Sequence, residues 1–186
     1  EQEQRGEEEK SWQVYVDSAL LQTYEDEEHL KRWNDTFGAN WRPSSPYDIL
    51  PAYDNRFMNQ RREMYRAWVL WRIDHDRSVN ASLFYVDHED YMQYDGFRKR
   101  GEFRFALSLF GNGLDCHRTY EALLFGNIVI TQTSPMDALF RRHDLPVVIV
   151  NDFSEINATM LRRWYSEYQP KLAAARHKLT NEYWVK

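Results

Sequence analysis

The sequence predicts an α/β fold, a Rossmann-like parallel sheet flanked by helices. Three runs of strand length, at residues 103–110, 127–131 and 146–150, consist mostly of apolar side chains. Nearly continuous apolar runs of this length are typical of strands that are buried on both faces of a sheet. Helical segments separate the three runs, and strands that alternate with helices form parallel sheets with right-handed crossovers.

The first 53 residues lack this alternation. Residues 1–10 carry five Glu and no large apolar side chain, so we expect a disordered acidic tail there. Residues 11–53 are rich in aromatic side chains, and their three prolines favour extended loop over helix. We interpret residues 11–53 as an irregular segment, either the remnant of an N-terminal domain or a linker, and place the Rossmann-like domain at residues 54–186.

Within that domain, apolar side chains near helical spacing predict a helix at residues 55–76, and a short strand is expected at residues 82–86. Asp87 is expected to cap a helix that ends by Gly101. After the strand at residues 103–110, Asp115 is a good N-cap for a helix through Phe125. Gly126 suits the left-handed residue that ends such a helix. The remaining helices are expected at residues 135–142, after an N-cap at Ser154, and from about Pro170 to the C-terminus.

Charge and composition exclude several classes of protein. The formal net charge is −5, so no global field attracts nucleic acid. No apolar run approaches the roughly 20 residues that span a bilayer. The first residue is Glu, so we expect a fragment or a processed chain, in which a membrane anchor could only have stood in a missing N-terminal segment. With one cysteine, Cys116, no intrachain disulfide can form.

Three Asn-x-Ser/Thr sequons begin at Asn34, Asn80 and Asn157. Chance gives about one sequon in a chain of this composition, so three are a mild excess. They are candidate glycosylation sites and favour a location in the lumen of the Golgi or the endoplasmic reticulum. A cytoplasmic location is the alternative.

Ionisable side chains concentrate in the stretch "GNGLDCHRTYEALLFGNIVIT", which follows the strand at residues 103–110. Ligands of open parallel sheets bind beyond the carboxyl ends of the strands, and a Gly-rich turn into a helix offers free N–H groups to a phosphate. Arg118 supplies a charged fork for a diphosphate, and Glu121 can accept hydrogen bonds from ribose hydroxyls. A purely structural interpretation remains open, in which Asp115 caps the helix, Arg118 pairs with Asp115 and Glu121, and His117 is a surface residue.

The longer segment "LSLFGNGLDCHRTYEALLFGNIVITQTSPMDALFRRHDLPVVIV" resembles the donor-binding segment of exostosin-like glycosyltransferases. The resemblance covers roughly residues 103–155 and rests on the ordered pattern of Gly-Asn-Gly, Asp-x-His-Arg-x-x-Glu-Ala-Leu and "LPVVIV". It implies a GT-B-type fold of two Rossmann-like domains, of which this chain contains the C-terminal half. Residues 54–186 would then be the nucleotide-sugar-binding domain, and the enzyme would be a hexosyl- or pentosyltransferase.

The resemblance also implies roles for individual residues. Glu121 would bind the donor ribose, while Arg118 would contact the diphosphate or hold Glu121. The other implied donor-binding residues are Gly111, Asn112, Gly113, Asp115, His117, Ser134 and Pro135. Asp115 and His117 are also the candidates for catalysis, with roles that the pattern does not separate. No metal and no cofactor are expected, because cationic side chains and helix N-termini stabilise the leaving diphosphate in such enzymes.

The sequence departs from the family pattern at two positions. Phe110 stands where many members have Arg, which removes one phosphate-facing cation. Val129 stands where the second strand commonly has Pro. The expected partners are a nucleoside-diphosphate sugar as donor and a glycan or protein hydroxyl as acceptor, with no nucleic acid.

Two other functions remain open. Asp74, His75 and Asp76 could form the metal site of another glycosyltransferase fold, in which carboxylates hold Mn²⁺ or Mg²⁺ against a diphosphate. Alternatively, the chain is a non-catalytic or degenerate glycosyltransferase-like module that binds sugar without transferring it. Cys116 and His117 cannot form a catalytic dyad, because adjacent helical residues point about 100° apart.

Overall fold

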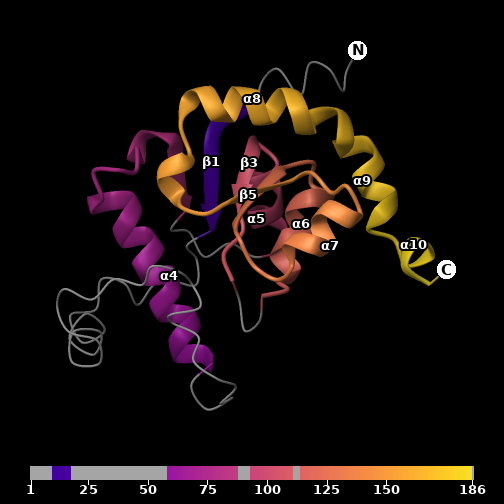
Figure 1. Cartoon of the computed structure of the whole chain (residues 1–186), viewed down its shortest axis with the longest axis horizontal. Coiled ribbons are helices and arrows are strands. Elements are labelled where there is room, and N and C mark those ends of the chain that lie inside the picture. The colour runs from indigo at the N-terminus through magenta and orange to yellow at the C-terminus, as the bar shows by residue number, and fades with distance from the viewer. Residues whose placement is uncertain (1–9, 18–57, 88–92, 111–113, 186) are drawn as a thin grey trace.

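The computed structural model of the chain describes residues 10–17, 58–87, 93–110 and 114–185. In these residues five parallel strands form one sheet with the order β2-β1-β3-β4-β5 (Figure 1). The expected α/β fold with a parallel sheet flanked by helices is therefore confirmed. The strands are β1 (Ser11–Asp17), β2 (Phe84–Asp87), β3 (Phe103–Leu107), β4 (Ile128–Gln132) and β5 (Val147–Val150).

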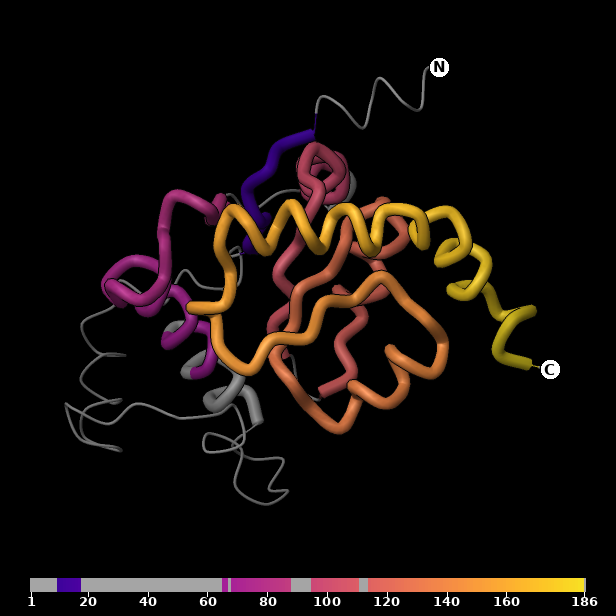
Figure 2. Tube along the Cα trace, turned by 45° about the horizontal axis from the view of Figure 1, so that its top comes forward, coloured from indigo at the N-terminus to yellow at the C-terminus, as the bar shows by residue number. Residues whose placement is uncertain are grey.

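Helices cover both faces of this sheet. They are α4 (Met58–His75), α5 (Gln93–Arg100), α6 (His117–Leu124), α7 (Asp137–Arg142), α8 (Ala158–Tyr168), α9 (Leu172–Lys178) and α10 (Asn181–Trp184). One apolar core joins α4 and α8 to one face, and a second joins α6 and α7 to the other. Figures 1 and 2 show α8 crossing the sheet and α9 and α10 continuing from it to the C-terminus. None of the described helices is both long and apolar enough to span a membrane.

The strand order explains which helices share a face. From β1 the chain reaches β2 on one side, and from β3 it proceeds through β4 to β5 on the other side. Since parallel crossovers are right-handed, a reversal of direction puts the connecting helices on opposite faces. Hence α4, between β1 and β2, lies on one face, whereas α6 and α7 lie on the other.

Strand β1 corrects the expected division of the chain. Residues 11–53 are expected to be irregular and to precede a domain that begins at residue 54, but residues 11–17 form an interior strand of the sheet, between β2 and β3. Val14 and Val16 are fully buried on the α4 face, and Tyr15 is buried on the α6 face. The strand begins with Ser-Trp-Gln, so its own apolar pattern is weak, and pairing with β2 and β3 on its two sides stabilises it. Residues 1–9 and 18–53 lie outside the described residues.

Other element boundaries shift by a few residues. Strand β3 ends at Leu107, although Ser108, Leu109 and Phe110 remain buried. Asp87, the expected cap, is the last residue of β2, and within the described residues α5 begins only at Gln93.

Caps after β5 also differ from expectation. Asp152 rather than Ser154 caps a short 3-10 helix, Phe153–Glu155, and Asn157 caps α8 by accepting a hydrogen bond from the Met160 N–H at 3.0 Å. Aspartate and asparagine are better placed here because their side-chain oxygens reach an N–H two or three residues on.

Candidate functional site

The order of the strands places a topological switch point at the carboxyl ends of β1 and β3. These two strands are neighbours, and the connections that follow them run to opposite sides of the sheet. Open α/β sheets bind ligands at such a switch point, and in the order 2-1-3-4-5 it lies between β1 and β3. Asp17 is the last residue of β1, and the segment after β3 leads to α6.

The loop that enters α6 is described only in part. Gly111, Asn112 and Gly113 lie outside the described residues. The segment before them is tied to the helix, since the hydroxyl groups of Ser108 and Thr119 share a buried hydrogen bond of 2.7 Å. The residues that follow the strand therefore lie against the first turn of α6.

Asp115 does not cap α6, contrary to the sequence prediction. The helix begins at His117, and its N-cap residue is Cys116, whose side chain makes no capping hydrogen bond. Asp115 instead hydrogen-bonds Tyr120, and burial together with this bond raises the pKa of Tyr120. Asp115 and His117 are exposed to solvent next to the first turn of the helix.

Arg118 and Glu121 form ion pairs that the sequence analysis did not foresee. The structural interpretation paired Arg118 with Asp115 and Glu121, one helical turn away. In the structure Arg118 Nε lies 3.3 Å from Asp17 Oδ2, and Glu121 Oε2 lies 3.5 Å from Arg100 Nη1. The partners come from β1 and from α5, so both predicted ligand-binding residues face the sheet end rather than each other.

Asp17 and Arg100 complete a network of alternating charge, which we call the switch-point network: Arg118, Asp17, Arg100 and Glu121. Arg100 Nη2 donates a hydrogen bond to Asp17 Oδ2 at 3.1 Å, so Asp17 receives both arginines. The two cations balance the two carboxylates. Because each charge is paired with an opposite one, the network offsets the free-energy cost of partly burying four charged groups.

Beside this network, Tyr15 and Asp87 join the ends of β1 and β2. The Tyr15 hydroxyl donates a buried hydrogen bond to Asp87 Oδ2 at 2.9 Å, and burial and this bond raise the pKa of Tyr15. Asp17 and Asp87 are register partners in the parallel pair, so two carboxylates end neighbouring strands. The sequence carried a signal for this, because "VYVD" ends β1 and "FYVD" ends β2.

The loop after β4 contains the other predicted donor-binding residues. Ser134 is buried and Pro135 is exposed. Asp137, the first residue of α7, closes the loop by accepting hydrogen bonds from the Thr133 hydroxyl at 2.7 Å and from the Ser134 N–H at 2.8 Å. The hydrogen bonds of this loop that the described residues show stay within the loop and α7, and those of the switch-point network stay within β1, α5 and α6.

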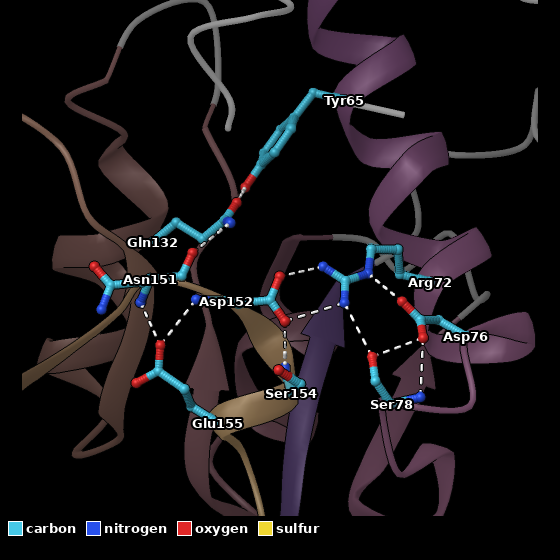
Figure 3. Close-up of polar contacts among 9 residues, drawn as sticks. All are labelled: Tyr65, Arg72, Asp76, Ser78, Gln132, Asn151, Asp152, Ser154 and Glu155. Carbon is cyan, nitrogen blue, oxygen red and sulfur yellow. Dashed lines mark hydrogen bonds and ion pairs between the residues drawn. The ribbon is translucent and has the colours of Figure 1, made fainter. Parts of the chain in front are cut away.

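A second polar cluster lies where α4 crosses the ends of β4 and β5 (Figure 3). The Tyr65 hydroxyl donates to Gln132 Oε1 at 2.6 Å, and Gln132 Nε2 donates to the Asn151 carbonyl at 3.3 Å. Nearby, Arg72 binds Asp152 through both terminal nitrogens. These contacts fasten α4 to the sheet.

The same cluster engages part of the alternative metal site. Arg72 Nε donates to Asp76 Oδ2 at 2.7 Å, and hydrogen bonds from Ser78 are the main reason that the pKa of Asp76 is lowered. His75 Nδ1 lies 3.3 Å from the Trp71 carbonyl, one turn back along α4. In the described part of the chain no three His, Cys, Asp or Glu side chains converge as metal ligands do.

Two of the three sequons fall within the described residues. Asn80 and Asn157 are exposed, and each side-chain oxygen accepts a capping hydrogen bond, from the Ser82 and Met160 N–H groups respectively. Asn34 lies outside the described residues.

Comparison of the sequence with models of known protein families and with curated proteins found no match.

Proposed function

We propose that the chain is the donor-binding part of a glycosyltransferase, the C-terminal half of a GT-B-type enzyme. It transfers a sugar from a nucleoside-diphosphate sugar to a glycan or protein hydroxyl. The observation that carries this proposal is the 3.3 Å ion pair between Arg118 and Asp17. It brings the start of α6 to the carboxyl end of β1, where open α/β sheets bind nucleotides. The resemblance of residues 103–155 to exostosin-like donor-binding segments supports it.

The switch-point network has the chemistry for the two polar parts of such a donor. The planar fork of Arg118 can bind diphosphate oxygens, which compete with Asp17 for the same N–H groups. Glu121 turns Oε2 toward Arg100, and its ion pair within the described residues uses this oxygen rather than Oε1. Oε1 can accept a hydrogen bond from a ribose hydroxyl. We propose that the reaction needs no metal, since cations and the N-terminus of α6 stabilise the leaving diphosphate.

Asp115 and His117 remain the candidates for catalysis, because both are exposed at the start of α6. The second candidate function is binding without transfer. Phe110 favours this second function. Its side chain is buried, and its ring centre lies 5.4 Å from that of Tyr65, so it packs in the core. Many members of the family that the segment resembles have an arginine at this position. We propose the Golgi or endoplasmic reticulum lumen as the location, as the three sequons indicate.

Calorimetry of the purified chain with UDP, GDP, CDP and ADP, with and without EDTA, tests the donor site. We expect one nucleotide to bind irrespective of EDTA. Glu121→Ala and Arg118→Ala should each weaken that binding by about 1–3 kcal/mol, the scale of a hydrogen bond to a charged group. The matched controls are Glu167→Ala and Arg163→Ala, which remove exposed charges from α8 and should leave binding unchanged.

The other outcomes separate the alternatives. Binding that EDTA abolishes would favour the metal site at Asp74, His75 and Asp76. Normal binding by both α6 variants would refute the assignment of the site. Binding without slow hydrolysis of the donor sugar or transfer to any acceptor would favour the degenerate module, and the absence of binding by any of the four nucleotides would refute the donor site.

A further inference from the structure

Arg100 is a buried arginine that is held from several sides. Its side chain is 7% exposed, and its guanidinium carbon lies 5.6 Å from the centre of the Tyr15 ring and 6.0 Å from that of Phe97. Its carbonyl accepts a hydrogen bond of 3.0 Å from Asn127 Nδ2, and Asn127 is fully buried. The backbone and the guanidinium are thus fixed by β1, α5 and the residue before β4.

The two terminal nitrogens of Arg100 face different carboxylates. Nη2 donates to Asp17 Oδ2 at 3.1 Å, and Nη1 lies 3.5 Å from Glu121 Oε2. Nη1 is buried and makes no hydrogen bond within the described residues. The carboxylate of Glu121 is therefore the ion-pair partner of this nitrogen. An arginine stays charged when buried and presents its donors in a rigid fork, so its place dictates where the carboxylates settle.

We propose that Arg100 is a positioning residue for recognition of the donor's ribose. It holds Oε2 of Glu121 and so directs Oε1 of the same carboxylate toward the ribose hydroxyls. Through Asp17 it also supports Arg118, so one buried guanidinium sets the ribose-binding carboxylate and the diphosphate-binding cation together. This inference rests on the proposed function, because it needs a ribonucleotide in the site.

The experiment compares affinity for a nucleoside diphosphate with affinity for its 2′,3′-dideoxy counterpart. The ligand is whichever of UDP, GDP, CDP and ADP the wild-type chain binds. A change in diphosphate or base contacts alters both affinities alike and cancels in their ratio. Loss of ribose recognition changes the ratio of the two affinities. A general weakening of the fold lowers both affinities and leaves their ratio unchanged.

We expect wild-type protein to prefer the ribonucleotide by about tenfold or more, the effect of hydrogen bonds to a charged group. Glu121→Gln and Arg100→Gln should each lower this preference severalfold, and the double variant should lower it no further. Arg100→Lys keeps the charge but offers no fork, so its preference should be intermediate. Lys99→Gln, which removes the adjacent cation that pairs with Glu102, is the control and should keep the preference.

Urea unfolding establishes first that each variant is folded. If Arg100→Gln does not fold, Arg100→Lys decides. An unchanged ribose preference in a folded Arg100 variant overturns the inference and leaves the proposed function intact. A wild-type chain that binds the diphosphate without a ribose preference also overturns it, whereas a wild-type chain that binds no nucleotide refutes the proposed function and this inference with it.

Discussion

Replacing Asp152 with Asn tests how strongly one ion pair holds α4 to the sheet. Asp152 caps the 3-10 helix after β5 and binds both terminal nitrogens of Arg72 near the end of α4 (Figure 3). Asparagine keeps a side-chain oxygen for the capping bond to the Ser154 N–H and is an equally good cap. The substitution therefore removes the negative charge but keeps a hydrogen-bond acceptor for the Ser154 N–H.

The size of the effect follows from the pKa of Asp152. Burial raises this pKa, but the hydrogen bonds from Arg72 and Ser154 outweigh burial and lower it from 3.8 to about 2. Each pKa unit corresponds to about 1.36 kcal/mol, so the whole shift would correspond to about 2.5 kcal/mol in a fully shielded site, and Ser154 supplies part of it. The Asp152 side chain is 40% exposed, however, and Arg72 keeps Asp76 as a second partner. Solvent screening reduces the expected loss in Asp152→Asn to about 1 kcal/mol.

Urea unfolding as a function of pH measures this loss. Because the pKa is lower in the folded protein, the contribution is fully present above the unfolded value of 3.8 and is lost as the pH falls toward about 2. Wild type and variant should differ by about 1 kcal/mol at pH 7, and the difference should shrink between about pH 4 and pH 2.

The control is Glu102→Gln, which breaks the surface ion pair between Glu102 and Lys99. The Glu102 side chain is 56% exposed. This variant should stay within about 0.5 kcal/mol of wild type. A difference for Asp152→Asn that persists unchanged at pH 2 would refute the electrostatic argument, because that pH is well below the unfolded pKa and near the folded one, where most of the contribution is lost.

Two further predictions concern stability. Gly126 follows α6 with φ of 77°, so Gly126→Ala should cost about 1–2 kcal/mol in urea unfolding through backbone strain, and Gly126→Asn should cost less. An equal loss in both variants would contradict this explanation. Tyr65→Phe leaves the buried Gln132 Oε1 without its 2.6 Å donor and should cost about 1–3 kcal/mol. Adding Gln132→Leu should restore part of that loss. If the double variant lost as much free energy of unfolding as the two single variants together, the result would argue against this hydrogen bond.

Much of the sheet could be predicted because its strands carry their own pattern. Residues 103–107, 128–132 and 147–150 form β3, β4 and β5 within a few residues of the expected positions. Each run is mostly apolar, as burial on both faces favours. Gly126 likewise has the predicted left-handed conformation, since this is a local property of the end of a helix.

The candidate site follows partly from the sequence and partly from the tertiary structure. The sequence by itself identified α6 as its carrier and selected Arg118 and Glu121, because charged residues after a buried strand and a Gly-rich turn stand out locally. Tertiary structure alone decided their partners, Asp17 and Arg100, and placed β1 inside the sheet between β2 and β3. Arg100 and Asp17 are 83 residues apart in the chain. Periodicity reports which face of a segment is buried, whereas the meeting of two strand ends depends on the order in which all the strands pair.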